Sequence, residues 1–314
     1  MKILFTGASS FTGYWFVNKL VEAGHDVWAC FTRGNAEAYG DDIRGRRVKR
    51  VIEWCNPQFS YRFGDEQFLN IMTDEAFDLL CHHAADVTNY KSADFDIASA
   101  VASNTHRVRD VLTALATQSG AAFLLTGSVF EPGEGAGSEG LPALSPYGLS
   151  KSLTAKICEY YCRTLGVRMG KFVIPNPFGP WEDMRFTSYL MRTWSRGDEA
   201  GVRTPDYVRD NIHVSLLAAA YVAFAETLSS RDGHCRTNPS GYVESQGLFA
   251  ERIAREMRVR TGWECRLAYG SQAEFDEPRI RINTEPVDGR ALGWDESTAW
   301  DGLAVYYEGS HAPT

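Results

Sequence analysis

The sequence contains no long hydrophobic run. No uninterrupted apolar stretch approaches the ~20 residues that a membrane-spanning helix needs, and only a short apolar run precedes the first polar residues and glycine. We therefore expect no membrane contact and no secretory signal peptide. The 314 residues, of which 44% are hydrophobic and 23% charged, are typical of a globular protein of about two domains.

Basic residues are also scarce. The 32 lysines and arginines are outnumbered by 40 acidic residues, which gives a net charge of −8 with both signs interleaved. This balance argues against a nucleic-acid partner. The seven cysteines are odd in number and scattered, so they indicate free thiols in the reducing cytoplasm and not a disulfide framework. The histidines lack metal-ligand spacing, and we expect no metal site.

Strand-like and helix-like segments alternate through the first part of the chain. The alternation predicts an α/β fold with a doubly wound parallel sheet over residues 1–180. After residue 180 it becomes irregular, which predicts a smaller C-terminal α/β domain over residues 181–314, with some segments returning to the first domain. The expected strands cover 2–6, 26–32, 44–53, 77–83, 121–126 and 171–174, and the expected helices 11–23, 97–118, 147–165, 188–196, 215–228 and 248–258.

A glycine-containing turn follows the first expected strand. Gly7 and Gly13 frame Ser10, Phe11 and Thr12 where that strand meets the first helix. In a dinucleotide-binding (Rossmann) fold, such a turn lets backbone N–H groups and the helix N-terminus face a pyrophosphate. Ser10 stands where a glycine is usual. The alternative is a plain tight turn, but the position directly after the first strand favours a phosphate loop.

The end of the second expected strand bears on which dinucleotide fits. An acidic side chain there binds the ribose hydroxyls of NAD, whereas an arginine accommodates the 2′-phosphate of NADP. This chain has Thr32 and Arg33 there and no acid, which favours NADP(H) over NAD(H) unless Arg33 is only a solvated surface residue. The basic cluster at 44–50 is either a solvated face or a second partner of that phosphate. Asp65, after the third expected strand, is placed to reach the adenine.

Tyr147 and Lys151 lie four residues apart and therefore on one face of their expected helix. A tyrosine with an ordinary pKa is a weak acid–base group at neutral pH, and a neighbouring cation shifts it towards the working range. Thr126 ends the preceding buried strand, where its hydroxyl can hold a substrate carbonyl or alcohol. The Tyr–Lys pair alone is common on exposed helices, but together with Thr126 it predicts an oxidoreductase site.

Further motifs follow in order along the chain. They are His82-His83-Ala84-Ala85, Asn104, Thr126-Gly127-Ser128-Val129-Phe130, the run PNPFGP at 175–180, the run VRDNIHV at 208–214, and Leu292-Gly293-Trp294. Together with the phosphate loop and the Tyr–Lys pair, this series resembles the extended short-chain dehydrogenases/reductases over nearly the whole chain. Within that family it is similar to the nucleotide-sugar epimerase, dehydratase and reductase group.

The resemblance implies a role for each matched residue. Tyr147 is the implied general acid/base, Lys151 its electrostatic partner and Thr126 the hydroxyl that orients the reacting oxygen, with Tyr147 and Lys151 also contacting the cofactor. Asn176 and Arg209 are implied to hold the diphosphate of a nucleotide-sugar substrate, which would occupy the C-terminal domain. The resemblance also implies a homodimer. It adds four residues to the cofactor contacts: Ala84, Ala85, Asn104 and Pro175.

Two departures from the family pattern narrow the function. Gly127 and Ser128 stand where 4,6-dehydratases have an Asp-Glu pair, so elimination of water is not expected. The second arginine with which many members hold the diphosphate is not evident in residues 272–278, which leaves open how the nucleotide is recognised.

Three functions remain at this point. The favoured one is NADPH-dependent reduction of a nucleotide-linked keto sugar. It is favoured because the second expected strand is followed by Arg33 and not by an acidic residue. The alternative is a nucleotide-sugar 4-epimerase with tightly bound NAD, which oxidises the sugar and reduces it again on its other face. The third is a non-catalytic module that senses a dinucleotide, which the intact set of Thr126, Tyr147 and Lys151 disfavours.

Overall fold

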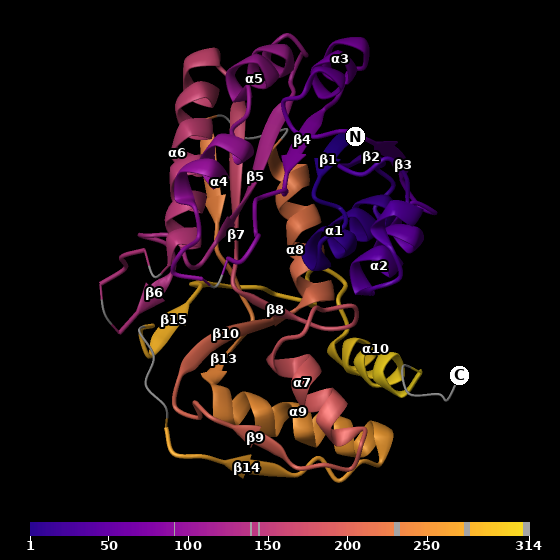
Figure 1. Ribbon diagram of the computed structural model, residues 1–314, viewed down its shortest axis with the longest axis vertical. Coiled ribbons are helices and arrows are strands. Elements are labelled where there is room, and N and C mark those ends of the chain that lie inside the picture. Colours follow the sequence, from indigo (N-terminus) through magenta and orange to yellow (C-terminus); the bar gives the residue numbers. More distant parts are fainter. Residues whose placement is uncertain (91, 139, 144, 229–232, 273–276, 310–314) are drawn as a thin grey trace.

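A sheet of seven parallel strands forms the larger part of the protein (Figure 1), in the order β11-β7-β5-β4-β1-β2-β3. The computed structural model describes residues 1–90, 92–138, 140–143, 145–228, 233–272 and 277–309. From β1 the chain first adds β2 and β3 on one side and then β4, β5, β7 and β11 on the other. The direction in which the chain crosses from strand to strand therefore reverses between β1 and β4. The strands are β1 (Lys2–Thr6), β2 (Asp26–Phe31), β3 (Asn56–Phe59), β4 (Leu79–His82), β5 (Ala122–Ser128), β7 (Arg168–Ile174) and β11 (His234–Thr237).

Helices cover both faces of this sheet. One face packs against α1 (Phe11–Glu22), α2 (Ile43–Val51) and α8 (Val214–Thr227), with the short η1 (Glu37–Tyr39) beside α2. The other face packs against α3 (Glu66–Asp74), α5 (Val108–Ala116) and α6 (Pro146–Leu165), and α4 (Ile97–Asn104) lies on α6. All seven residues of β5 are buried, as expected for a strand covered on both faces. The prediction of a doubly wound Rossmann sheet is confirmed.

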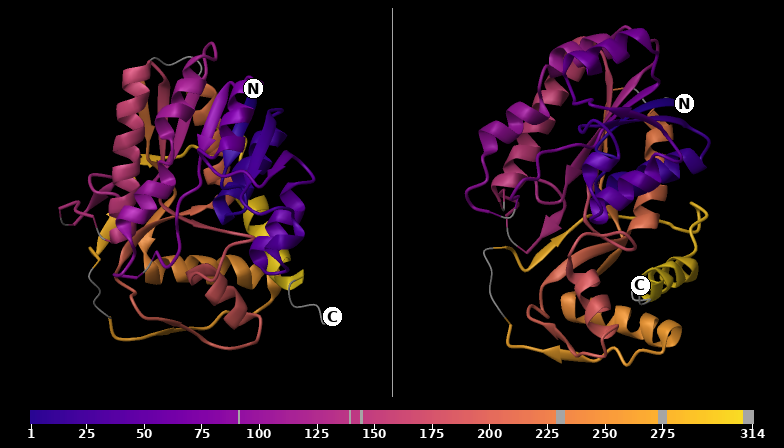
Figure 2. Two further views of the ribbon diagram at one scale, coloured as in Figure 1. Left: turned by 45° about the horizontal axis from the view of Figure 1, so that its top comes forward. Right: turned by 45° about the vertical axis from the view of Figure 1, so that its right-hand side comes forward.

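A smaller sheet lies below the carboxyl ends of the large one, as Figure 2 shows. Its order is β13-β10-β15-β6, with β8 paired to β10. Its strands are β6 (Ala136–Gly137), β8 (Asn176–Phe178), β10 (Val208–His213), β13 (Tyr242–Ser245) and β15 (Ile280–Ile282). The adjoining helices are α7 (Phe186–Trp194), α9 (Gln246–Thr261) and α10 (Glu296–Gly309). Two short ladders pair β9 (Ala200–Val202) with β14 (Leu267–Tyr269) and β12 (Pro239–Ser240) with β16 (Glu285–Pro286).

The prediction of a strand at 44–53 is wrong. Those residues form most of α2, which begins after Asp42, whose carboxylate accepts a hydrogen bond from the Gly45 N–H at 2.8 Å. The buried side chains of α2 recur at helical spacing, and the charged residues between them hide that period. The third strand is β3, which lies at the edge of the sheet and is only partly buried. An edge strand therefore carries little hydrophobic signal in the sequence.

The helix expected at 97–118 is divided in two. Arg107, between α4 and α5, has a left-handed backbone conformation with φ 47°. A continuous helix cannot include that conformation, so the chain turns there and α5 packs on α3 and α6 separately from α4.

The chain passes between the two sheets more than once. Both β6 and β8 precede residue 180 and join the small sheet, while α8 and β11 follow residue 180 and join the large one. None of the helices in the described part of the chain has the length and hydropathy that a bilayer crossing requires.

Candidate active site

The turn between β1 and α1 is built for close approach of backbone. Gly7 has φ +89°, and a Cβ there would lie 2.8 Å from the backbone nitrogen of Ala84. A Cβ on Gly13 would lie 2.2 Å from the Gly7 carbonyl oxygen. Real Cβ atoms do not come so near to backbone, so both positions need glycine.

The Ser10 side chain makes two hydrogen bonds within the same turn. Its hydroxyl accepts a hydrogen bond from the Gly13 N–H at 3.1 Å and donates to the Gly7 carbonyl oxygen at 2.9 Å. The N–H groups of Phe11 and Thr12 belong to the first turn of α1, where a helix supplies no partner for them. With the positive end of the helix dipole behind them, they fit a pyrophosphate.

Two exposed guanidinium groups flank one aromatic ring at the end of β2. The guanidinium of Arg33 lies 4.9 Å from the centre of the Tyr39 ring, and that of Arg44 lies 5.3 Å from it. Arg44 also donates to the Ser9 hydroxyl of the phosphate loop, at 3.0 and 3.1 Å. The Thr32 hydroxyl lies 3.5 Å from the Tyr39 hydroxyl. Thr32 and Arg33 are the residues predicted to bind the 2′-phosphate of NADP. Arg44, one member of the basic cluster, contacts the same Tyr39 ring as Arg33.

Asp65 and Asn104 are two further residues predicted to contact the cofactor. Asp65 precedes α3, and its carboxylate is 3.8 Å from the His106 ring. Asn104 is buried, accepts a hydrogen bond from the Asp86 N–H at 2.8 Å and donates to the Thr154 hydroxyl at 3.4 Å. The Asn104 amide therefore holds the segment after β4, where Ala84 and Ala85 lie, and is itself occupied by protein groups.

Two of the predicted catalytic residues, Thr126 and Lys151, are in contact where β5 and α6 come together. The Lys151 ammonium is buried and donates to the Thr126 carbonyl oxygen at 2.6 Å. Tyr147 lies one helical turn before Lys151 in α6. That helix begins after Ser145, whose hydroxyl accepts a hydrogen bond from the Gly148 N–H at 3.1 Å. The cap fixes the start of the helix and so the place of Tyr147 beside the strand end.

Burial decides the protonation of Tyr147. Its ring packs against those of Tyr90 and Phe95, with centroids 5.5 and 6.1 Å away. Burial raises the pKa of Tyr147, the carboxylate of Glu131 raises it further, and the guanidinium of Arg185 opposes them. The phenol is therefore protonated at neutral pH. Burial also lowers the pKa of Lys151. The sequence suggested that Lys151 lowers the pKa of Tyr147, whereas in the structure the pKa of Tyr147 is raised.

His83 connects the phosphate loop to Thr126, a link that sequence reasoning missed. Its Nδ1 lies 2.9 Å from the Thr126 hydroxyl, and its Nε2 lies 3.0 Å from the hydroxyls of both Ser10 and Thr12. Burial lowers the pKa of His83 to about 3, so the ring is neutral. A histidine at the end of a fully buried strand was the available signal, because such a ring needs polar partners.

The two residues predicted to hold the substrate diphosphate, Asn176 and Arg209, lie in the small sheet. Pro175 joins β7 to β8, and the Asn176 amide donates to the Asp210 carbonyl oxygen at 3.4 Å. Arg209, in β10, forms an ion pair with Glu277 at 2.9 Å. A phosphate at Arg209 would compete with that carboxylate.

An exposed arginine, Arg185, acts electrostatically on Tyr147. It precedes α7, and its guanidinium lies 5.9 Å from the centre of the Phe11 ring. No motif in the sequence singles it out.

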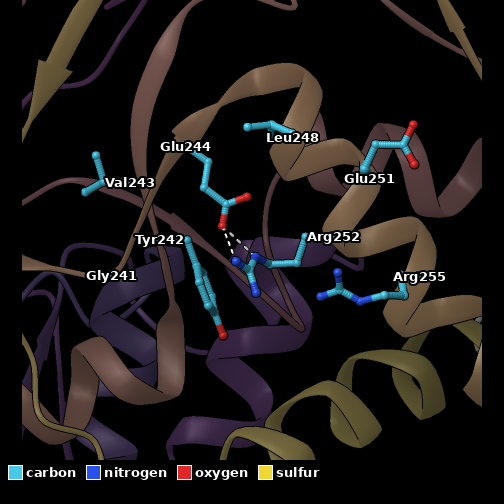
Figure 3. A pocket seen from close by; sticks show the side chains of 8 residues that line it. All are labelled: Gly241, Tyr242, Val243, Glu244, Leu248, Glu251, Arg252 and Arg255. Carbon is cyan, nitrogen blue, oxygen red and sulfur yellow. Dashed lines mark hydrogen bonds and ion pairs between the residues drawn. The ribbon is translucent and has the colours of Figure 1, made fainter.

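The hollow drawn in Figure 3 lies elsewhere, over β13 and α9, and encloses about 530 Å³. An ion pair between Glu244 and Arg252, at 2.5 Å, crosses it. None of the residues predicted for the site lines it. The lining residues are Gly241, Tyr242, Val243, Glu244, Leu248, Glu251, Arg252 and Arg255.

Comparison with known proteins identifies the family. The sequence matches the NAD dependent epimerase/dehydratase family over residues 3–238, and no curated protein sequence matches it. The fold is similar to that of UDP-glucuronic acid 4-epimerase from Bacillus cereus, solved with UDP-glucuronic acid and NAD (17% identity, 99% of this chain and 100% of that chain, TM-score 0.73). It is also similar to UDP-glucose 4-epimerase from Thermotoga maritima, solved with UDP-glucose (20% identity, 99% and 100%, TM-score 0.72). The family match covers most of the chain, which therefore belongs to the NAD-dependent epimerase/dehydratase family of enzymes.

Proposed function

We propose that this enzyme is a nucleotide-sugar 4-epimerase that acts through a keto intermediate of the sugar. The observation that carries the proposal is the hydrogen bond from the Lys151 ammonium to the Thr126 carbonyl oxygen near the carboxyl end of β5, with Tyr147 one turn before Lys151 in α6. That set suits reversible oxidation of a secondary alcohol. The similar structures named above are UDP-sugar 4-epimerases, which supports a UDP-sugar as substrate.

Each of the two sheets would bind one ligand. The large sheet and its helices would hold the dinucleotide, with the pyrophosphate at Phe11 and Thr12, and the small sheet would hold the nucleotide sugar near Asn176 and Arg209. The fit to a dinucleotide rests on the two glycines that no Cβ can replace and on the open first turn of α1. When bound, the nicotinamide supplies the hydride acceptor and donor.

Residues of the protein would transfer the proton. Tyr147 would accept it from the sugar hydroxyl at its phenolic oxygen during oxidation and return it during reduction, which requires that the phenol has lost its own proton in the cofactor-bound enzyme. The Thr126 hydroxyl would hold the reacting oxygen in line with Tyr147, and Lys151 would fix the strand end that carries Thr126.

NADPH-dependent reduction of a nucleotide-linked keto sugar is the second candidate. It was favoured by the sequence, and the arrangement of Arg33 and Arg44 around Tyr39 supports NADP(H) as the cofactor. The family and the similar structures support the epimerase instead. Cofactor choice and reaction type are separate questions, since an epimerase needs only that the cofactor stay bound.

The first experiment denatures the purified protein, identifies any released dinucleotide by mass spectrometry, and titrates the emptied protein with NADPH and NADH. A dinucleotide retained near one per chain supports the epimerase, because its cofactor is regenerated in each turnover. An empty site that binds NADPH and exchanges it freely supports the reductase and contradicts the epimerase.

A further inference from the structure

A cluster of buried charged side chains lies on the face of β5 that α6 covers. Lys171 of β7 is in register with Leu125 of β5, whose side chain packs among residues of α6. Lys171 therefore approaches β5 from the same face as Lys151. Its ammonium forms ion pairs with two carboxylates of the segment after β5, at 2.5 Å with Glu131 and at 2.9 Å with Glu134. Both carboxylates are buried, so charges of both signs lie beside the candidate active site.

Glu131 and Lys151 bind backbone groups of β5 that are two residues apart. The Lys151 ammonium donates to the Thr126 carbonyl oxygen at 2.6 Å, and the Glu131 carboxylate accepts from the Ser128 N–H at 2.8 Å. Gly127 lies between them, and a Cβ there would lie 3.0 Å from the Glu131 carboxylate oxygen. The glycine therefore leaves room for the carboxylate next to the strand.

The Glu131 carboxylate acts on both members of the Tyr–Lys pair. A buried ammonium is costly unless a carboxylate offsets its charge. Burial lowers the pKa of Lys151, the Glu131 carboxylate is the strongest of the groups that oppose this, and the Lys171 ammonium adds to the lowering. Burial raises the pKa of Tyr147, and the Glu131 carboxylate raises it further. A carboxylate beside an ammonium and a phenol favours the protonated form of each.

The other titratable groups around Lys151 are neutral. Burial lowers the pKa of His82 to about 4 and that of His83 to about 3. Burial raises the pKa of Cys158 to about 12. At neutral pH none of these three groups is charged, which leaves the buried ion pair as the charge that acts on Lys151 in the described part of the chain.

The remaining cations of the cluster depend on Glu134. Arg236 forms an ion pair with it at 3.2 Å. Arg281 is buried and donates to the carbonyl oxygens of Val129 and Glu131, and Glu134 opposes the lowering of its pKa by burial. Cations therefore outnumber carboxylates among the described residues of the cluster, and no second carboxylate there is free to replace Glu131.

We propose that Glu131 is a positioning residue, whose buried carboxylate holds Lys151 and Tyr147 in their protonated forms. Lys171 keeps that carboxylate in place. The proposal rests on the proposed function of Tyr147 and Lys151, because the protonation of this pair sets the pH range in which the enzyme can transfer a proton.

The direct test is the titration of Lys151 in the cofactor-free protein. Carbon NMR on protein labelled at its lysine side chains follows each ammonium as the pH rises, and loss of one signal in Lys151→Met assigns it. We expect Lys151 to be charged at neutral pH in the wild type and to lose its proton about one pH unit or more lower in Glu131→Gln. A neutral Lys151 in the wild type, or an unmoved titration in Glu131→Gln, overturns the proposal.

Two further variants separate charge from packing. Glu159→Gln changes an exposed carboxylate of the same helix and should leave the titration of Lys151 unmoved. Glu131→Gln combined with Lys171→Met removes both charges of the ion pair, so no buried charge is left without its partner. The double variant should shift Lys151 less than Glu131→Gln alone. An equal shift would mean that altered packing moves Lys151, and would overturn the proposal.

The dependence of kcat on pH in the cofactor-loaded enzyme gives the second test. In Glu131→Gln we expect both limbs of the profile to move to lower pH by about one unit, with KM within about twofold. A lower kcat with both limbs in place would show a purely structural role and overturn the proposal. If the wild type turns over no nucleotide sugar, the proposed function fails, while the titration of Lys151 still decides the role of Glu131.

Discussion

At the scale of single residues, the site depends on polar groups that are buried and nearly all paired. Thr126, His83 and Lys151 are each buried and each hydrogen-bonded to another element. Spacing in the sequence was enough to select Tyr147, Lys151 and Thr126. It was not enough to find the contacts of His83 or to select Arg44 within the basic cluster at 44–50. Their partners lie 43 and 35 residues away along the chain, and only the fold brings them together.

Tyr147→Phe removes the proposed proton carrier and leaves the ring in place. We expect kcat to fall about 100-fold or more, while the cofactor Kd changes little because the phosphate loop is untouched. Steady-state kinetics and a cofactor titration measure both. Tyr160→Phe, an exposed change in the same helix, is the control. Unchanged turnover in Tyr147→Phe would refute the assigned role.

Arg33→Ala and Arg44→Ala test the choice of dinucleotide. If their guanidinium groups hold a 2′-phosphate, each change should weaken NADPH binding about 10-fold, the scale of a charged hydrogen bond. NADH binding should stay within about twofold. Arg46→Ala is the matched control, since Arg46 is exposed on the same helix and lies over Trp181 instead. Tighter binding of NADH than NADPH by the wild type would contradict the prediction.

At the scale of elements, the turn from β1 to α1 was predicted correctly and the segment at 44–53 was not. A turn that needs glycine leaves a mark in the sequence at the residues themselves. Whether a short basic segment forms an edge strand or a surface helix depends on what packs against it. Here the capping carboxylate of Asp42 and the burial of Arg47 against Trp181 and Asp183 favour the helix.

Gly13→Ala tests the turn. The added Cβ would meet the Gly7 carbonyl oxygen, so we expect cofactor binding to weaken at least 10-fold and the free energy of unfolding to drop by roughly 1–3 kcal/mol. Denaturant titration and cofactor titration measure the two effects. Gly302→Ala, in α10 with nothing near its Cβ, should be neutral or slightly stabilising. A Gly13→Ala protein that binds cofactor normally would show that the loop has another conformation.

At the scale of the whole molecule, alternating segments predicted the parallel sheet, because each crossover is short and local. The irregular pattern after residue 180 predicted that some segments return to the first domain. It did not identify them as α8 and β11, and it did not show that β6 joins the small sheet. Those contacts join segments far apart in the chain, and no local pattern specifies the partner of an apolar face.

Glu182 gives the whole molecule a pH dependence. It is buried, and burial raises its pKa to about 8, against 4.5 for an ordinary glutamate. Between these values the unfolded chain loses the proton and the folded protein keeps it, so the free energy of unfolding falls as pH rises.

Glu182→Gln should remove that dependence. We expect the variant and the wild type to be equally stable near the lower pKa, and the variant to be more stable by on the order of 5 kcal/mol above pH 8, because each unit of pKa difference corresponds to about 1.4 kcal/mol. Denaturant titrations across this range measure the difference. Glu22→Gln, at an exposed ion pair, should show no such trend. Parallel curves for wild type and Glu182→Gln would mean that Glu182 is ionised in the folded protein.

The most direct test of the central claim follows a UDP-hexose deuterated at C4 by NMR and mass spectrometry, together with the nicotinamide absorbance. The account predicts that the 4-epimer appears with its deuterium retained and with no net change in reduced cofactor. The contradicting result is no epimer from any UDP-sugar tested, with reduced cofactor consumed in proportion to an added keto sugar.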